Sequence, residues 1–122
     1  MFDKVAFTLY PVTDSARARA FYGTTLGLKM GSASPDGVWT EYDLPGGGCL
    51  ALFATKDIEP SATAGGSVAL EVEDLDTLNT RLASEGVRYK APMIHSPVCR
   101  MSVILDSEGN ALILHELKRK KP

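Results

Sequence analysis

The feature that most constrains this chain is a repeat at half its length. Asp14 recurs as Asp74 after 60 positions, and Gly47 recurs as Gly109 after 62 positions, in a chain of 122 residues. One copy is too short to bury the apolar side of its own sheet, so the repeat predicts two similar units that pair around a common cleft. The units pair either within one chain or between two chains, and the sequence leaves both arrangements open.

The first copy has the pattern of a strand, a helix and three strands. Residues 5–12 are rich in β-branched and aromatic side chains, which favours a strand. Asp14 can cap a helix that runs to residue 26, and Gly27 can end it. Its predicted inner face consists of Ala18, Phe21, Tyr22 and Leu26. Turn signals at 34–37 and 45–48 separate predicted strands at 28–32, 38–44 and 49–54.

The second copy repeats this order after a polar segment of small residues at 57–66. A strand is predicted at 67–72, followed by a helix that Asp74 caps and Gly86 ends, with an apolar stripe of Leu75, Leu78 and Leu82. Further strands are predicted at 87–90, 101–105 and 111–117, with a long loop through Pro92 and Pro97 between the first two. The predicted fold class is α+β, with two βαβββ modules forming a curved mixed sheet around a cleft. Module one spans 1–56, the linker 57–66, module two 67–117 and a basic tail 118–122.

Charge is distributed unevenly along the chain. Four of its 13 basic residues crowd positions 118–121, which leaves nine against 15 acidic residues in the rest. This excess of acids repels nucleic acid, so we expect no nucleic-acid partner. The tail is interpreted as a solubilising end, with weak polyanion binding as the alternative.

Targeting signals and cysteine motifs are absent from the sequence. No apolar run approaches the roughly 20 residues of a membrane span, and residues 1–6 do not resemble a signal peptide. We therefore expect a cytoplasmic protein with no membrane partner. Cys49 and Cys99 fit neither a disulfide framework nor a zinc motif, so we expect free thiols, with a single disulfide as the alternative.

Three segments resemble a known superfamily. They are residues 9–14 with Phe21, Tyr22 and 26–28, the second capped strand at 69–74, and the turn at 106–110 before the last strand. In this order and spacing the chain resembles the vicinal oxygen chelate superfamily, which includes glyoxalases, bleomycin-resistance proteins and extradiol dioxygenases. The resemblance implies a single domain of that type over 1–122.

Members of that superfamily hold a divalent cation with four ligands, usually His, Glu or Gln. The resemblance places these ligands seven residues before each capping Asp and four residues after each turn glycine. In this sequence the four positions are Phe7, Ser67, Ala51 and Ile113, which supply one weak oxygen donor, and a shift of one residue adds no His, Glu or Asp. We therefore expect no metal and no cofactor, and assign the chain to a metal-free branch.

Alternate residues of a strand share a face, so steps of two from these four positions predict the lining of the cleft. The repeat, together with what the resemblance to the superfamily implies, adds positions from the middle strands. The predicted ligand-binding residues are Phe7, Trp39, Glu41, Ala51, Phe53, Ser67, Met101, Val103, Ile113 and His115. The wider inward set also contains Leu9, Cys49, Ala69, Glu71 and Ala111. A mostly apolar cup with few polar groups is typical of a small-molecule site.

Several of these residues have two interpretations. Trp39 and Phe53 either pack in a core or stack on a planar ligand. Glu41 and Glu71 either lie in water at strand ends or, if buried, act as a base or bind a ligand cation.

The remaining polar candidates lie in the second copy. His115 is the best candidate for acid–base chemistry, although the sequence identifies no orienting partner, and a structural role is the alternative. His95 is expected at the surface of the Pro-rich loop. Arg100 either clamps an anionic ligand or is solvated. No catalytic residue is assigned beyond the candidates His115, Glu41 and Glu71.

The leading functional hypothesis is a metal-free protein that binds or sequesters a planar, partly apolar small molecule, as bleomycin-resistance proteins do. A metal-independent isomerase or lyase that uses Glu41, Glu71 or His115 is the first alternative, and a non-catalytic structural or regulatory remnant is the second. Unpaired strand edges and a wide apolar face predict a homodimer.

Overall fold

A computed structural model describes residue 1 and residues 4–118, and the chain divides into two units, Met1–Pro60 and Ser61–Pro122. The division falls inside the predicted linker. Residues 119–122 of the predicted basic tail lie outside the described residues. Each unit contains one four-stranded mixed sheet and one helical segment, which confirms the α+β prediction.

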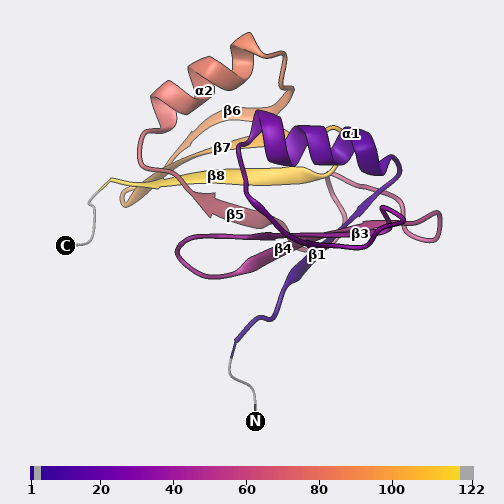
Figure 1. Cartoon of the computed structure of the whole chain (residues 1–122). Helices are drawn as coiled ribbons and strands as arrows, with labels where there is room; N and C mark the ends of the chain where they lie inside the picture. The colour runs from indigo at the N-terminus through magenta and orange to yellow at the C-terminus, as the bar shows by residue number, and fades with distance from the viewer. Residues whose placement is uncertain (2–3, 119–122) are drawn as a thin grey trace. The chain divides into compact units, whose positions relative to one another are not determined.

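The N-terminal unit follows the predicted order of elements. It contains β1 (Thr8–Val12), α1 (Ser15–Arg19), the π-helical segment η1 (Ala20–Thr25), β2 (Met30–Ala33), β3 (Trp39–Asp43) and β4 (Cys49–Ala54). The strands are ordered β1-β4-β3-β2, with β1 parallel to β4 and the other neighbours antiparallel. Figure 1 shows α1 lying over one face of this sheet.

The core of the N-terminal unit lies between that face and the helix. Tyr42 and Leu50 of the sheet are buried, as is Tyr22 of η1, whose ring stacks on Tyr42 at 6.0 Å between centroids. Ala18 and Phe21 are buried on the helical side, as predicted. Each large side chain removed from water in this way contributes about 1.5–3 kcal/mol.

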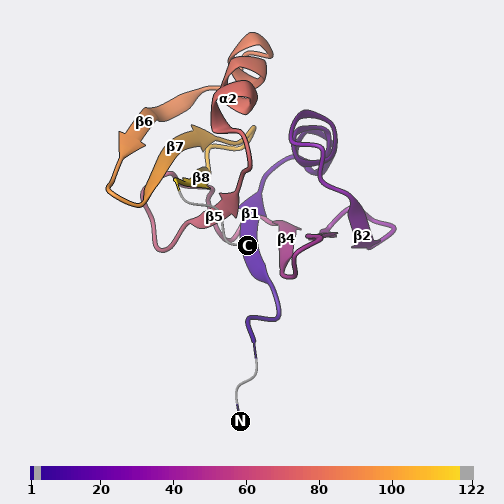
Figure 2. The same cartoon turned by 90° about the vertical axis from the view of Figure 1, so that its left-hand side faces the viewer.

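The C-terminal unit repeats the arrangement. It contains β5 (Val68–Glu71), α2 (Leu75–Ser84), β6 (Tyr89–His95), β7 (Cys99–Leu105) and β8 (Ala111–Leu117), with the strand order β5-β8-β7-β6. Figure 2 shows α2 over one face of its own sheet. Leu75 and Leu82 of α2 are fully buried together with Ile104, Leu112 and Leu114 of the strands.

Strand register supports the repeat deduced from the sequence. In the parallel pair of the N-terminal unit, Leu9 is opposite Ala51, and in the parallel pair of the C-terminal unit, Ala69 is opposite Ile113. The first members of these pairs are 60 positions apart and the second members 62, as the sequence predicts.

The two helical segments begin alike and continue differently. Asp14 caps α1 by accepting from the N–H of Arg17 at 3.0 Å, and Asp74 caps α2 by accepting from the N–H of Thr77 at 3.1 Å. Gly27 and Gly86 follow the helices with φ values of 76° and 81°. Gly27 lies 13 positions after its capping Asp, whereas Gly86 lies 12 positions after its own. A π-helical turn accommodates one such extra residue, so the predicted first helix is present but its second half is π-helical.

Two strand predictions also need correction. β2 begins at Met30 rather than at 28, because the N–H of Leu28 still bonds the carbonyl of Tyr22 at 2.9 Å. The segment predicted as a Pro-rich loop is instead part of β6, which extends to His95 and contains Pro92. β6 is an edge strand with two irregularities in its register, and such a strand tolerates a residue that has no N–H donor.

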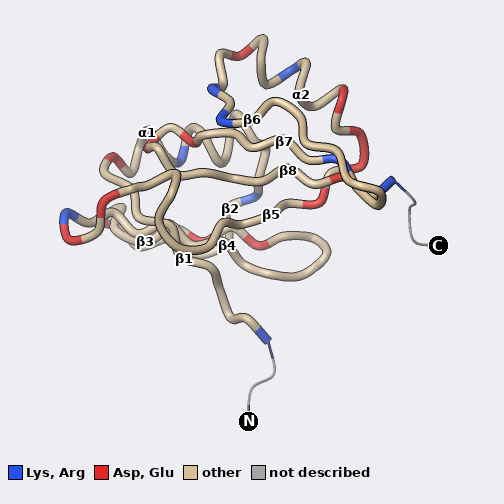
Figure 3. The backbone as a smooth tube through the Cα atoms, turned by 180° about the vertical axis from the view of Figure 1, so that it is seen from behind, with Lys and Arg blue, Asp and Glu red and all other residues tan. Residues whose placement is uncertain are grey.

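None of the helices among the described residues is long and apolar enough to cross a membrane. Both acidic and basic residues occur along α2 and its flanks, as Figure 3 shows. One of these pairs, Arg81 and Glu85, forms an exposed ion pair one helical turn apart at 2.6 Å.

Candidate functional site

Each sheet has one face that its own helix does not cover, called here its helix-free face. Strand alternation and register place eight residues of the N-terminal sheet on this face. They are Leu9, Pro11, Trp39, Glu41, Asp43, Cys49, Ala51 and Phe53. The predicted residues Trp39, Glu41, Ala51 and Phe53 therefore share one face, on which Ala51 is fully buried.

Aromatic rings gather at one end of this face. Phe7, which precedes β1, meets Trp39 edge to face at 5.3 Å between centroids, and Trp39 lies 6.0 Å from Phe53. Phe7 is 45% exposed, and the other two rings are half-buried. These rings thus combine mutual packing with accessible surface, which is the character of an aromatic binding face rather than of a closed core.

A polar group adjoins the rings. Glu41, opposite Ala51 in the middle of the sheet, accepts the indole N–H of Trp39 at 2.7 Å. The predicted alternative of a glutamate in water at a strand end was therefore wrong. The bond fixes the orientation of the indole and leaves the remaining carboxylate lone pairs for a donor on a ligand.

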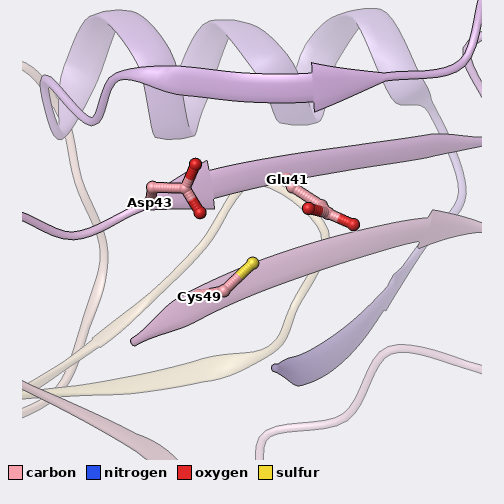
Figure 4. A group of neighbouring side chains, drawn as sticks. All are labelled: Glu41, Asp43 and Cys49. Carbon is pink, nitrogen blue, oxygen red and sulfur yellow. The ribbon is translucent and has the colours of Figure 1, made fainter. Parts of the chain in front are cut away.

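Glu41 also belongs to a cluster with Asp43 and Cys49 (Figure 4). One ligand atom of each side chain lies within 4.8 Å of the others, so these three residues could hold a cation. Burial, followed by the nearby carboxylates of Glu41 and Asp43, raises the pKa of the Cys49 thiol. At neutral pH the thiol therefore stays protonated, and a protonated thiol is a poor metal ligand.

Sequence reasoning did not single out Asp43. The signal was present, because Glu41 and Asp43 are two positions apart on a strand and so share a face. What was missing was the register of β3 against β4, which places Asp43 opposite Cys49.

The four positions at which relatives hold a metal do not fit that role here. Phe7, Ala51 and Ile113 have no donor atom, and Ser67 is exposed just before β5. Ala51 and Ile113 occupy the central strand pairings that the sequence predicts for ligands. The side chains at these four positions therefore offer at most one oxygen donor, the hydroxyl of Ser67.

The helix-free face of the C-terminal sheet contains a different polar pair. Glu71 and His115 are opposite each other in the parallel pair β5 and β8, and His115 Nδ1 lies 2.6 Å from Glu71 Oε1. Glu71 Oε2 also accepts the N–H of Leu117 at 3.2 Å. The sequence identified no orienting partner for His115, and the structure supplies one in Glu71. Met101, Val103 and Ile113 share this face, as predicted.

Arg100 has a structural position on the other face of that sheet. Its guanidinium bonds Glu116 Oε1 at 2.7 Å and Asp76 at 3.2 Å, and these carboxylates raise the Arg100 pKa, with Glu116 as the main cause. Both predictions for Arg100, an anion clamp and a solvated side chain, were wrong. The ion pairs attach β7 to β8 and to the start of α2.

A surface hollow runs along α2, away from the predicted residues. It is lined by Asp76, Thr77, Thr80, Arg81 and Ser84. These side chains are polar and belong to a single helix, so the hollow contributes nothing to the predicted ligand site.

Comparison with known proteins identifies relatives of the whole chain. The chain matches the family model of the Glyoxalase/Bleomycin resistance protein/Dioxygenase superfamily over residues 4–114. No match is found among curated proteins.

Solved structures with the same fold cover almost the whole chain. A superfamily member from Sphaerobacter thermophilus is 25% identical, with a TM-score of 0.78 over 94% of this chain and 98% of the other. TnmS3, an antibiotic binding protein from Streptomyces sp. CB03234, is 25% identical, with a TM-score of 0.80 over 96% and 98%. A glyoxalase/bleomycin resistance protein/dioxygenase from Alicyclobacillus acidocaldarius is 17% identical, with a TM-score of 0.75 over 96% and 93%, and shows likeness of fold.

The family model spans most of the chain, and the strand order and register repeat in both units as the resemblance implies. The chain therefore belongs to the glyoxalase, bleomycin resistance protein and dioxygenase superfamily.

Proposed function

We propose that this protein binds a planar, partly apolar small molecule on the helix-free face of its N-terminal sheet, without a metal ion. The observation that carries the proposal is the group of Phe7, Trp39 and Phe53 beside Glu41. Flat rings provide stacking area at little cost in conformational entropy, and one buried polar anchor fixes the orientation of a ligand. A relative of similar size and fold, TnmS3, is an antibiotic binding protein, which supports the same kind of role.

The charge on this face restricts the ligand further. Glu41 and Asp43 contribute two carboxylates, and none of the described residues on this face is Lys, Arg or His. An anionic ligand would meet like charges with no compensating cation, whereas a neutral or cationic one would not. We therefore expect neutral or cationic planar ligands.

A fluorescence titration tests the proposal, because Trp39 is the single tryptophan of the chain. Three probes with rings of similar size are compared: an acridinium cation, neutral naphthalene and a naphthalenesulfonate. The cation and the neutral probe should change Trp39 emission with saturation, and the sulfonate should bind at least about tenfold more weakly. Tight binding of the sulfonate, or no saturable change with any probe, would contradict the proposal.

Variants on the two faces of the same sheet provide a matched control. Phe53→Ala removes a ring beside Trp39 and should weaken binding about three- to tenfold, since an aromatic contact contributes roughly 0.5–1.5 kcal/mol. Met30→Ala removes a side chain that is 42% exposed and aligned with Tyr42, on the side of the helix. That variant should bind as the parent does.

The metal-free state is part of the proposal and has its own test. The four ligand-equivalent positions argue against a metal, whereas the Glu41, Asp43 and Cys49 cluster is the alternative place for one. Native mass spectrometry after incubation with zinc, nickel, iron or manganese should show no stoichiometric ion. A bound ion that is lost in Asp43→Asn would show that the ligand set has moved to this cluster.

We also propose a homodimer located in the cytoplasm. β2 and β6 are edge strands of the two sheets and can pair with another chain. Sedimentation equilibrium should give twice the chain mass of 13.1 kDa, and a monomer at micromolar concentration would contradict the dimer.

A further inference from the structure

We propose that the Glu71–His115 pair accepts the proton of a weakly acidic hydroxyl, of the phenol or enol class, on a small planar molecule. This site lies on the C-terminal sheet. It goes beyond the proposed binding at Trp39 and rests on a different set of contacts.

The geometry of the pair is fixed from two strands. The parallel register of β5 and β8 places Glu71 opposite His115, and the N–H of Val72 bonds the carbonyl of His115 at 2.8 Å. One carboxylate oxygen meets His115 Nδ1 at 2.6 Å, and the other accepts the N–H of Leu117 at 3.2 Å. The carboxylate thus holds the ring in one orientation.

This contact determines which ring nitrogen is available. A carboxylate accepts hydrogen bonds, so in the neutral ring Nδ1 carries the proton and Nε2 keeps a lone pair. The side chain of His115 is 26% exposed and that of Glu71 is 53% exposed, so a solute can reach the pair. A histidine held by a carboxylate with its other nitrogen accessible is the usual arrangement of a proton acceptor.

The surroundings select the class of ligand. Met101 lies opposite His115 on β7, and Ile113 and Val103 continue the same face, so the floor beside the ring is apolar. Among the described residues of β5, β7 and β8, no Lys or Arg shares this face; Arg100 is on the other side with Glu116 and Asp76. An anionic ligand would therefore be repelled by Glu71, while a neutral ring with a hydroxyl would not.

The proton moves from the ligand hydroxyl to His115, and no other reactant is needed. The O–H bond of the ligand breaks, its electron pair stays on oxygen, and a new N–H bond forms at Nε2 of His115. The resulting imidazolium lies beside the Glu71 carboxylate, which stabilises it. Abstraction of a proton from carbon would also need donors to stabilise the enolate oxygen, and the described face supplies none, so the proposal is restricted to hydroxyl acids.

The test uses 2-naphthol, whose ionised form has its own absorption band and which ionises well above the ordinary histidine range, so that a neutral ring is available to accept the proton. About one unit below its own pKa, roughly a tenth of the free probe is ionised. Probe bound to the full chain should show a phenolate-to-phenol ratio about tenfold higher. His115→Gln should return the ratio to that of free probe, and Glu71→Gln should reduce the gain to about threefold. His95→Gln, on β6 and aligned with Arg100, should behave as the parent does.

A second measurement does not depend on the variants. The chain has two histidines, so ¹⁵N NMR can follow both in one sample. Neutral His115 should carry its proton on Nδ1, and the probe should shift its Nε2 resonance while His95 stays constant.

An Nε2-protonated His115, no binding at millimolar probe, or an unchanged phenolate ratio in His115→Gln would each overturn the inference. Trp39 fluorescence reports separately on binding at the helix-free face of the N-terminal sheet. Loss of one response with retention of the other therefore tells which of the two proposals fails.

Discussion

The two units have the same strand framework and different chemistry at equivalent positions of their helix-free faces. Where the N-terminal sheet has Trp39 and Phe53 opposite each other, the C-terminal sheet has Met101 and His115. Pro11, the neighbour of Phe53 on β1, corresponds to Glu71, the neighbour of His115 on β5. An aromatic cluster in one unit is thus replaced by a carboxylate–imidazole pair in the other.

Further along the same strands, the polar side chains belong to the N-terminal sheet and the apolar ones to the C-terminal sheet. Glu41 and Asp43 of the N-terminal sheet correspond to Val103 and Leu105 of the C-terminal sheet. The strand register is the same in both sheets, whereas the side chains at equivalent positions differ. A shared fold therefore determines where a site can form but not what it binds. The four ligand-equivalent positions accordingly offer one weak oxygen donor, while polar side chains occupy other positions on the helix-free faces of both sheets.

The turns before the last strands show the same divergence and give the largest expected effect. In the C-terminal unit, Asp106 is 2% exposed and accepts the N–H groups of Glu108 and Asn110 at 2.8 Å and the Asn110 amide at 3.0 Å. Asp106→Ala leaves these donors unsatisfied and should lower the free energy of unfolding by about 2–4 kcal/mol, measured by urea denaturation.

The equivalent turn of the N-terminal unit has Leu44 in place of Asp106, so no buried carboxylate supports it and its glycines remain. Gly47 has a φ of 104°, so Gly47→Ala should cost about 1 kcal/mol or more. Gly46 is not among the positive-φ glycines and has open space around it, so Gly46→Ala is the matched control and should have little effect. If Asp106→Ala lowers the free energy of unfolding by no more than Gly46→Ala does, the inferred difference between the two turns is wrong.

Two tyrosines, the buried Tyr42 and the half-buried Tyr89, should respond differently to substitution by phenylalanine. The Tyr42 hydroxyl is buried with no hydrogen-bond partner among the described residues, whereas the Tyr89 hydroxyl donates to Asn79 Oδ1 at 2.7 Å. Tyr42→Phe should leave the free energy of unfolding unchanged or raise it by about 1 kcal/mol, and Tyr89→Phe should lower it by about 1 kcal/mol. Equal losses in both variants would contradict the difference in bonding.

The same tyrosines predict a dependence on alkaline pH. Burial raises the pKa of both hydroxyls, and Arg19 partly opposes this for Tyr42. A raised pKa in the folded state stabilises the fold below the unfolded value of about 10, and this contribution is lost as the pH rises through the folded value. Tyr42→Phe should therefore unfold at a higher pH than the parent, as followed by circular dichroism.

Much of the framework is predictable from the sequence because it follows local rules. The capping residues Asp14 and Asp74, the helix-ending Gly27 and Gly86, and the two repeat offsets are all confirmed. Local rules fail where one residue is inserted, as in η1, and where an edge strand tolerates Pro92.

The sites were harder to predict because their contacts join distant strands. Glu71 and His115 are 44 positions apart, and their contact depends on the parallel register of β5 and β8. Both residues belong to the inward set predicted from alternation, yet that set alone does not say which members are neighbours. The contact between Asp43 and Cys49 likewise depends on the register of β3 against β4, and Asp43 was not in the predicted set.

The smallest expected effect concerns the thiol of Cys49. Burial and the carboxylates of Glu41 and Asp43 raise its pKa, so its thiolate fraction at neutral pH is low and iodoacetamide should react slowly. Asp43→Asn removes one of these charges and should increase the alkylation rate at pH 8 about threefold, measured by site-resolved mass spectrometry. Asp36→Asn, an exposed acid in another turn, is the control and should leave the rate unchanged. An alkylation rate that is the same in Asp43→Asn as in the parent would contradict an electrostatic effect of Asp43 on the Cys49 thiol.

The central claim is that the aromatic face of the N-terminal sheet binds a planar ligand, and the indole N–H of Trp39 reports on it directly. This group gives a single NMR resonance because the chain has one tryptophan, and its hydrogen bond to Glu41 at 2.7 Å makes it sensitive to a ligand at that carboxylate. Titration with the acridinium cation should shift the resonance with saturation at one equivalent, and Glu41→Gln should weaken the effect. A resonance that stays fixed while other signals of the chain shift would show that the ligand binds elsewhere and would contradict the claim.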